Sequence, residues 1–389
     1  MRIGVDATVC ANRRGYGRFA REIIPAMARL SPHDEFVCFL DGASNEALIV
    51  DSPNVTRRIV STLRQSPTRA ASAEGHRSIG DLARMTLAVK SEKLDVFFSP
   101  SVYTYFPLAR GLPLVLTIHD AIPERFPEAV FLSSKQRLYW SLKMKLAVFQ
   151  SRRIVTVSDY AAGDLVRVLG IPREKITVAV EAPSAEFRPR ASVANSVTSD
   201  LPPGSKWIVY VGGFSPHKNV PLLVQAHANA TRELEEEAPY LLLIGTRDKD
   251  DFHTDVPAIE QMIAKEGTSA LVKWAGFVDD ENLSRIHSQS VALVLPSACE
   301  GFGLPAVEAA ACGSPVIATT ESPLPALLEG AGIFVNPGQV DQLAQAIIKL
   351  STDHEFHSAC SRSALARANA LSWDASARAV MDAIGSAAA

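Results

Sequence analysis

Short runs of β-branched and other apolar residues recur along the chain, with longer helical patterns between them. The first series predicts strands at 2–5, 35–40, 96–99, 114–118, 153–157 and 175–180. These runs show little alternation, which is typical of parallel strands that are covered on both faces. Strands that alternate with helices indicate βα units and a doubly wound sheet.

A second series of the same kind follows. It predicts strands at 207–211, 241–244, 272–274, 291–295 and 315–318. The segment 191–204 between the two series is polar, contains many small residues and ends in Pro and Gly, as linkers often do. The pattern predicts an α/β protein with two Rossmann-like, doubly wound parallel-sheet domains that face a cleft. The first domain would cover 1–190 and the second 205–371.

The composition agrees with two globular domains. The chain has 389 residues, of which 47% are apolar and 21% are charged, and this length suits two cores better than one. The cysteines are scattered without Cys-x-x-Cys spacing, which argues against a disulfide scaffold or a zinc ribbon and fits a reducing cytosol. The first residues run directly into a strand pattern, and no apolar run approaches the roughly 18–20 residues of a spanning helix. We therefore expect a cytoplasmic protein without a signal peptide.

The charge is divided unevenly along the chain. Residues 1–190 hold 27 Lys and Arg against 19 Asp and Glu, whereas residues 191–389 hold 12 against 23. The segment 135–153 carries six basic residues and no acidic one. Helical spacing places four apolar side chains on one stripe that we expect to face the core: Tyr139, Leu142, Leu146 and Phe149. The remaining side chains would meet anionic lipid headgroups at the inner face of the membrane, with a solvated face as the alternative: Trp140, Lys143, Lys145, Arg152 and Arg153.

The segment PSACEGFGLPAVEAAACGSPVIAT contains the clearest candidate site. It follows a buried strand pattern and predicts a turn, a helix with a proline in its first turn, and the next strand. The backbone amides of Gly301, Phe302 and Gly303 then lie at a helix amino terminus, where a diphosphate would bind. Glu300 and Glu308 lie on either side of these amides, and a carboxylate suits the vicinal hydroxyls of a ribose or a sugar. A helix cap at Glu300 and a helix ion pair at Glu308 are the structural alternatives.

With these residues, the chain resembles the retaining GT-B glycosyltransferases of the family 4 (group 1) type. The resemblance covers nearly the whole chain. It rests on Glu-x7-Glu with GFGLP between the glutamates, and on GYGRFAREI, LTIHDAIPERFPE, TVSDYAAGDLVRVLGIPREKI, VGGFSPHKN, WAGFVDDENL and LSWDASA. It implies the GT-B architecture, with residues 372–389 forming a helix that packs back on the first domain.

The resemblance also implies roles for the glutamates. Glu300 would contact the transferred sugar and Glu308 the nucleotide ribose, with the residues from Gly301 to Leu304 along the donor. The donor would be a nucleotide diphosphate sugar, with UDP- and GDP-sugars favoured, and no further cofactor is expected. A hexose or similar sugar would pass to a glycan, lipid-linked or small-molecule acceptor in surface-polysaccharide synthesis, and no nucleic-acid partner is expected.

A second donor motif, VGGFSPHKN, follows a strand and precedes a helix. Lys218 would neutralise the diphosphate as it leaves, and Gly213 would lie beside it. Many relatives carry an Arg where this chain has His217 or Gly213, so neutralisation would be weaker here or supplied by the other domain. By resemblance alone, three residues lie beside the nucleobase: Gly276, Phe277 and Val278.

The acceptor side is predicted in the first domain. His119 ends the strand pattern GLPLVLTIH, and ligands of open α/β sheets bind at the carboxyl ends of strands. The resemblance places His119 at the catalytic centre, although a general-base role is not favoured and a hydrogen-bonded loop histidine is the alternative. Gly15 and Gly17 would give backbone access near the diphosphate and the acceptor. Such a retaining transfer needs positioning and phosphate stabilisation more than a strong base.

Two sequence features resemble motifs of other enzyme classes. Gly15-x-Gly17-x-x-Ala20 with Asp41 resembles a dinucleotide fingerprint, but the glycines follow the strand too late for the tight turn of that motif, so a NAD-dependent dehydrogenase is a weak alternative. The Asp-x-Asp sequence at 248–250 imitates a metal site but lies among other charges, and we expect a metal-independent enzyme.

A catalytically silent sugar-nucleotide-binding or scaffold protein remains the competing class. The intact set of Glu300, Glu308, Lys218 and His119 argues against it.

Overall fold

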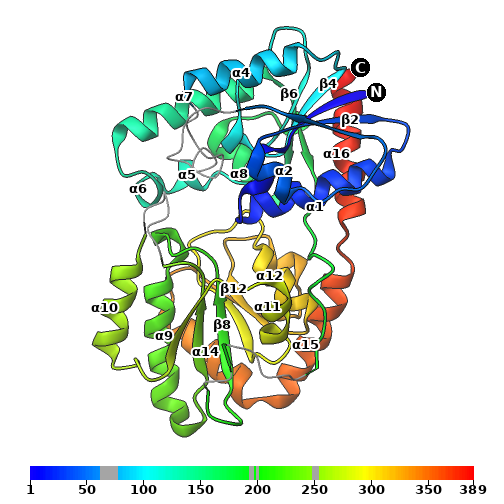
Figure 1. The fold of residues 1–389 in the computed structure, drawn as a ribbon. Helices are drawn as coiled ribbons and strands as arrows, with labels where there is room; N and C mark the ends of the chain where they lie inside the picture. The colour runs from blue at the N-terminus through cyan, green and yellow to red at the C-terminus, as the bar shows by residue number, and fades with distance from the viewer. Residues whose placement is uncertain (62–77, 192–196, 199–200, 248–253) are drawn as a thin grey trace. The chain divides into compact units, whose positions relative to one another are not determined.

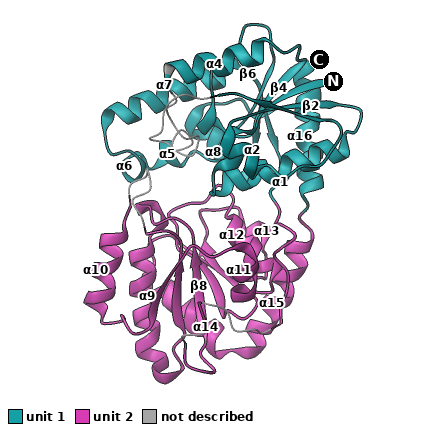
Figure 2. Ribbon diagram, in the orientation of Figure 1, with its two compact units in different colours: residues 1–181, 372–389 teal, residues 182–371 magenta. Residues whose placement is uncertain are grey.

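The structure is a computed structural model that describes residues 1–61, 78–191, 197–198, 201–247 and 254–389. The described residues form two compact units, one made of residues 1–181 with 372–389 and the other of residues 182–371 (Figure 2). Each unit contains a parallel β-sheet with helices around it, and Figure 1 labels these elements. The segment 248–250 lies outside the described residues.

The sheet of the first unit has, within the described part of the chain, seven parallel strands in the order β3-β2-β1-β4-β5-β6-β7. Their bounds are β1 Arg2–Asp6, β2 Glu35–Leu40, β3 Val55–Ile59, β4 Val96–Ser99, β5 Leu114–Thr117, β6 Ser151–Thr156 and β7 Ile176–Val178. Every residue of β4 and β5 is buried, which explains why the runs that predicted these strands lack alternation. The chain reverses its direction across the sheet between β1 and β4, which makes a topological switch point there.

Helices cover this sheet. They are η1 Ala7–Ala11, α1 Gly15–Leu30, α2 Gly42–Ala47, α4 Ile79–Lys90, η2 Val102–Thr104, α5 Ile122–Arg125, α6 Pro127–Val130, α7 Ser134–Gln150, α8 Asp159–Leu169, η3 Arg173–Lys175 and α16 Trp373–Ala388. The carboxy-terminal helix α16 packs against α1 and the strands of this unit. The rings of Phe19 and Trp373 lie 5.9 Å apart, and Arg153 Nε donates to Ser386 Oγ at 3.0 Å.

The sheet of the second unit has, over the residues that are described, six parallel strands in the order β10-β9-β8-β11-β12-β13. Their bounds are β8 Trp207–Val211, β9 Tyr240–Ile244, β10 Val272–Gly276, β11 Ala292–Leu295, β12 Val316–Thr319 and β13 Gly332–Val335. The helices are η4 Pro216–Lys218, α9 Val220–Leu234, η5 Glu235–Glu237, α10 Val256–Glu266, α11 Asp280–His287, α12 Leu304–Ala311, α13 Leu324–Leu327, α14 Val340–Thr352 and α15 His354–Asn369. Here the switch point lies between β8 and β11.

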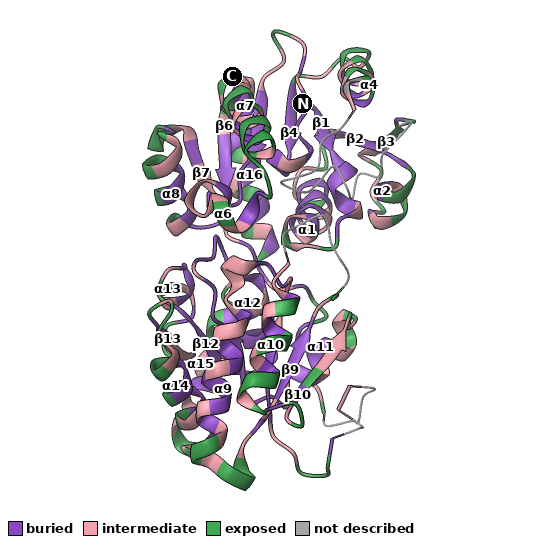
Figure 3. Cartoon of the chain, turned by 90° about the vertical axis from the view of Figure 1, so that its left-hand side faces the viewer, coloured by how far each residue is buried: buried purple, intermediate pink, exposed green. Residues whose placement is uncertain are grey.

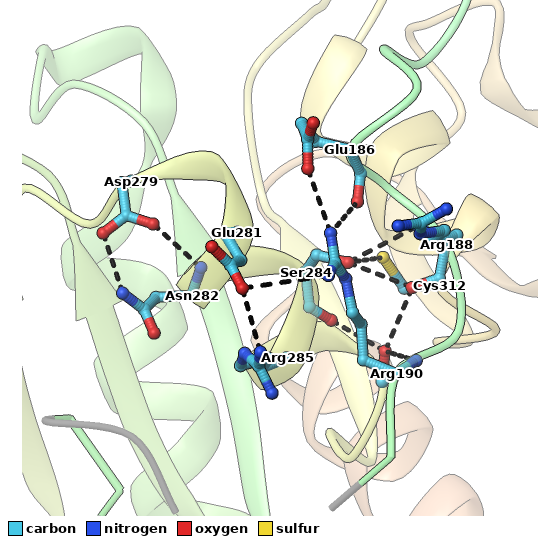
Figure 4. Close-up of polar contacts among 10 residues, drawn as sticks. Glu186, Arg188, Arg190, Asp279, Glu281, Asn282, Ser284, Arg285 and Cys312 are labelled. Atoms are coloured by element: carbon cyan, nitrogen blue, oxygen red, sulfur yellow. Dashed lines mark hydrogen bonds and ion pairs between the residues drawn. The ribbon is translucent and has the colours of Figure 1, made fainter. Parts of the chain in front are cut away.

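The boundary between the units differs from the prediction of a first domain that ends at 190. The first unit ends at Glu181, and the following segment packs on α11 of the second unit (Figure 4). Arg188 N donates to Ser284 Oγ at 3.4 Å, and Ser284 Oγ donates back to Arg188 O at 3.0 Å. These bonds attach residues 182–190 to the second unit. Of the predicted linker 191–204, residues 192–196 and 199–200 lie outside the described part.

Helix α7 is turned the opposite way from the prediction. The stripe expected in the core is exposed, at 41% for Tyr139, 59% for Leu142, 42% for Leu146 and 85% for Phe149. Trp140, expected at the surface, is buried instead. The ring of Trp140 lies 5.1 Å from the ring of Tyr103 and 6.4 Å from that of Phe131, and its indole N–H donates to Glu124 Oε1 at 2.6 Å.

Two of the basic side chains expected to face lipid also have partners in the protein. Lys143 Nζ donates to Tyr103 O at 2.5 Å. Arg153 donates to Ser386, as above, and to the carbonyl of Glu174 at 2.5 Å. The predicted lipid contact of Trp140 is therefore wrong, because its side chain is buried, whereas those of Lys143 and Arg153 stay predictions. None of the described helices is long and apolar enough to cross a membrane.

Candidate functional site

In the second unit, the predicted donor residues meet at the switch point of the sheet. Lys218 follows β8 and Glu300 follows β11, and these strands are neighbours although the two residues are far apart in the chain. Lys218 Nζ lies 2.7 Å from Glu300 Oε1, and Ser297 Oγ donates to the same oxygen at 2.6 Å. Glu300 is 8% exposed, so the pair is largely shielded from water. Ligands of open α/β sheets bind at such switch points.

The two loops are also joined through their backbones. Ala298 N donates to His217 O at 2.8 Å, and Asn219 Nδ2 donates to Pro296 O at 3.2 Å. Asn219 has a φ of 52°, a left-handed conformation that turns the chain sharply between η4 and α9. These contacts fix the position of Lys218 against Glu300 before any ligand binds.

The amino terminus of α12 adds a candidate anion site. Its N-cap is Gly303, whose φ of 88° and tight approach to Leu324 (a Cβ would lie 2.9 Å from a Leu324 methyl) exclude a side chain. Within the described residues, the amides of Phe302 and Gly303 donate to no protein group. Glu300 does not cap α12, so the cap alternative is wrong, and its carboxylate pairs with Lys218 instead.

Glu308 lies inside α12 and is 4% exposed. Leu304, the first residue of α12, and Phe302 are also buried. The structure thus places both predicted glutamates in the loop and helix that follow β11. Which group each glutamate holds stays a prediction.

Glycines lie at the carboxyl ends of β8, β9 and β10, namely Gly212, Gly245 and Gly276. Gly212 N donates to Ile244 O at 3.0 Å, and Gly245 N donates to Gly276 O at 2.9 Å. A Cβ on Gly245 would lie 2.1 Å from Gly212 O, so this edge tolerates no side chain there. Gly213 is next to Gly212, and space is open where its Cβ would lie.

The residues predicted beside the nucleobase lie further along the same edge. Gly276 ends β10, two strands away from β8 in the sheet, and Phe277 is 61% exposed just beyond it. Val278 follows between β10 and α11.

In the first unit, His119 lies two residues beyond β5, and a hydrogen bond to the backbone holds one of its ring nitrogens. Nε2 lies 3.0 Å from Pro100 O, and it donates because a carbonyl oxygen only accepts. Nδ1 lies 3.6 Å from Glu181 Oε1. The ring also packs edge-on against Phe19 at 5.1 Å, with Tyr16 at 6.3 Å. The hydrogen bond to Pro100 and the packing against Phe19 orient the ring.

Gly15 and Gly17 lie in the first turn of α1, after η1 and a short loop. A Cβ on Gly17 would lie 2.0 Å from Asn12 O, so the helix start packs directly on the loop backbone. The guanidinium of Arg21 donates to Cys10 O and Asn12 O, both at 2.6 Å, and holds this loop. The glycines do not form the tight strand-to-helix turn of a dinucleotide site, as expected.

Three residues near these groups were not predicted. Glu181 could have been found by the argument used for His119, because it follows the last strand of the first series. Ser297 lies three residues before Glu300, a signal too weak to single out. Glu124 lies in α5, shortly after His119, and burial raises the pKa of its carboxyl to about 7.

Comparisons with known proteins show the family of the chain. The family model for glycosyl transferases group 1 matches residues 194–367, and that for Glycosyltransferase Family 4 matches residues 13–179. O-antigen chain mannosyltransferase B of Escherichia coli is 27% identical over 92% of this chain and 93% of that protein.

Solved structures show the same fold. Sucrose-phosphate synthase of Thermosynechococcus elongatus gives a TM-score of 0.75 at 19% identity, over 98% of both chains. HepE of Anabaena, solved with UDP and glucose, gives 0.72 at 18% identity, over 99% of both chains. The fold is therefore that of a GT-B enzyme, as predicted. The chain belongs to the group 1, or family 4, glycosyltransferases.

Proposed function

We propose that this chain is a retaining, metal-independent glycosyltransferase that takes a hexose or similar sugar from a UDP- or GDP-sugar. The acceptor is a growing glycan or a lipid-linked sugar of a surface polysaccharide, and the enzyme works in the cytoplasm. The observation that carries the proposal is the pairing of Lys218 with Glu300 at the switch point of the second sheet. Support comes from the mannosyltransferase relative and from the UDP-bound structural neighbour.

The donor roles follow from the chemistry of each group. The Lys218 ammonium is a compact cation that neutralises the diphosphate as the bond from its oxygen to the anomeric carbon breaks. The amides of Phe302 and Gly303 bind the same phosphates at the amino terminus of α12. Glu300 accepts hydroxyls of the sugar, and Glu308 accepts those of the ribose.

The acceptor roles fall to the first unit. His119 orients the reacting sugar, with its ring held by the hydrogen bond to Pro100 O and by packing against Phe19. The acceptor oxygen then attacks the anomeric carbon on the face that the diphosphate leaves, and its proton passes to the departing phosphate. Nothing in this step requires a protein base, since positioning and phosphate stabilisation supply the rate.

A thermal-shift panel of UDP-, GDP-, ADP- and dTDP-sugars tests the proposal. A donor at 100 times its dissociation constant stabilises the protein by roughly 2.7 kcal/mol. Stabilisation by one nucleotide class, with transfer that persists in EDTA and retains the anomeric configuration by NMR, is the expected result. No response to any of these sugars would favour the silent scaffold.

A further inference from the structure

Helix α7 carries a stripe of exposed apolar side chains. Of twelve large apolar side chains exposed among the described residues, five lie on this one helix: Leu138, Tyr139, Leu142, Leu146 and Phe149. At 100° per residue they fall within an arc of about 100°. Leu132, 61% exposed, lies just before the helix. Figure 3 shows the exposed positions of α7 in green.

A continuous apolar stripe differs from the single exposed apolar residues found on every protein. Scattered ones need no explanation, whereas a contiguous patch marks a surface that something covers. The opposite face of α7 already packs on the protein, through Trp140, Met144 and Ala147. The helix is therefore folded against its own unit and still presents a second apolar face.

The charges beside the stripe identify what covers it. Four basic side chains are exposed on or next to α7: Lys135, Arg137, Lys145 and Arg152. The sequence contains no acidic residue from 129 to 158. Arg137 has one acidic neighbour, Glu128, at 3.8 Å. An apolar stripe with cations at its borders matches an anionic bilayer, whose headgroups meet the cations while the acyl region takes the apolar side chains.

A second copy of the chain fits this surface less well. Two copies docked through α7 would bring two basic borders together, and like charges across an interface oppose association. We propose that α7 docks the first unit on an anionic membrane by inserting its apolar stripe, with Phe149 and Leu142 as the deepest contacts. This inference goes beyond the proposed function, because it requires neither the donor nor the sugar.

Sedimentation with vesicles tests the docking surface. The full chain should bind vesicles of phosphatidylcholine with phosphatidylglycerol, and bind pure phosphatidylcholine much more weakly. Binding to the anionic vesicles should fall as salt rises, since headgroup attraction is screened within a Debye length. Lys135→Gln with Lys145→Gln should weaken anionic binding and flatten this dependence on salt.

Substitutions in the stripe separate insertion from surface attraction alone. Leu142→Ser with Phe149→Ser should reduce the partition coefficient at least tenfold, because each inserted side chain contributes more than a factor of about ten. Ile49→Ser is the matched control, because Ile49 is as exposed as Phe149, at 85%, but lies outside α7. It should leave binding unchanged.

Three outcomes would overturn the inference. These are vesicle binding that survives the stripe variant, binding that the control variant abolishes equally, and a wild-type dimer that becomes monomeric in the stripe variant without any vesicle binding. The last result would assign the stripe to a second copy. A nucleotide-sugar thermal shift measured on the same variants should match the wild type, so that failure of docking and failure of the proposed function can be told apart.

Discussion

The buried side chain of His287 should make the free energy of unfolding depend on pH. It ends α11 and is fully buried, and neither of its ring nitrogens has a hydrogen-bond partner among the described residues. Burial lowers the pKa of its imidazole to about 3, because the charged form loses its hydration. The folded protein thus holds this histidine neutral at pH values where the unfolded chain protonates it.

The sign and the size follow from linkage. The folded pKa of His287 lies below the unfolded value of 6.5. Protonation of His287 therefore costs no stability above pH 6.5, and the free energy of unfolding decreases as the pH falls from 6.5 toward about 3. The loss is about 1.4 kcal/mol per pH unit, or about 2 kcal/mol at pH 5. His287→Leu has a similar volume and no proton to take up. It should equal or exceed the wild type at pH 7.5, since it also removes two buried polar atoms without partners.

Urea unfolding at pH 7.5 and pH 5, followed by tryptophan fluorescence, measures the effect. Trp207 is a local reporter, because its indole donates to Ile286 O at 3.2 Å. The advantage of His287→Leu over the wild type should grow by about 2 kcal/mol between the two pH values. An advantage that is the same at both would refute the assignment of a neutral, buried His287.

Three further predictions concern the first unit. Gly17→Ala should displace the loop at Asn12, because its Cβ would lie 2.0 Å from the Asn12 oxygen, and circular-dichroism melting should show a lower Tm; an unchanged Tm would contradict this packing. His119→Ala should cut turnover by about 10²-fold with little change in nucleoside-diphosphate affinity, and near-normal turnover would remove His119 from the site. Glu124→Gln keeps an acceptor for the Trp140 indole and removes a carboxyl whose folded pKa is raised from 4.5 to about 7. The protonated carboxyl stabilises the fold fully below pH 4.5, and this stabilisation is lost as the pH rises through 7. In chemical unfolding, the free energy of unfolding of the variant relative to the wild type should therefore increase from pH 6 to pH 8. A difference independent of pH would contradict the raised pKa of Glu124.

The sequence predicts the fold well where burial leaves a simple pattern. The fully covered strands β4, β5 and β11 read as short apolar runs because both of their faces are buried. The edge strands β3 and β13 were not predicted. Strand β3 reads VTRRI and is largely exposed, so it lacks the signal of a core strand.

Helix α7 shows why periodicity alone can choose the wrong face. It has apolar residues on two faces, and the pattern cannot say which one packs. The choice depends on partners distant in the sequence, such as Glu124 for the Trp140 indole and the Tyr103 carbonyl for Lys143. Likewise, the meeting of Lys218 with Glu300 depends on β8 and β11 being neighbours, an order that strand patterns do not contain.

The central claim is that the loops after β8 and β11 bind a nucleotide diphosphate sugar, with Glu308 on the ribose and Glu300 on the sugar. Calorimetry with UDP and GDP, compared with turnover of the donor sugar, tests it most directly. Glu308→Gln should weaken nucleoside-diphosphate binding by roughly 1–3 kcal/mol, since charge-assisted hydroxyl bonds become neutral. Glu300→Gln should bind the bare nucleotide almost as the wild type does and yet transfer sugar slowly. If Glu300→Gln weakens the bare nucleotide more than Glu308→Gln does, the assignment of the two glutamates is wrong.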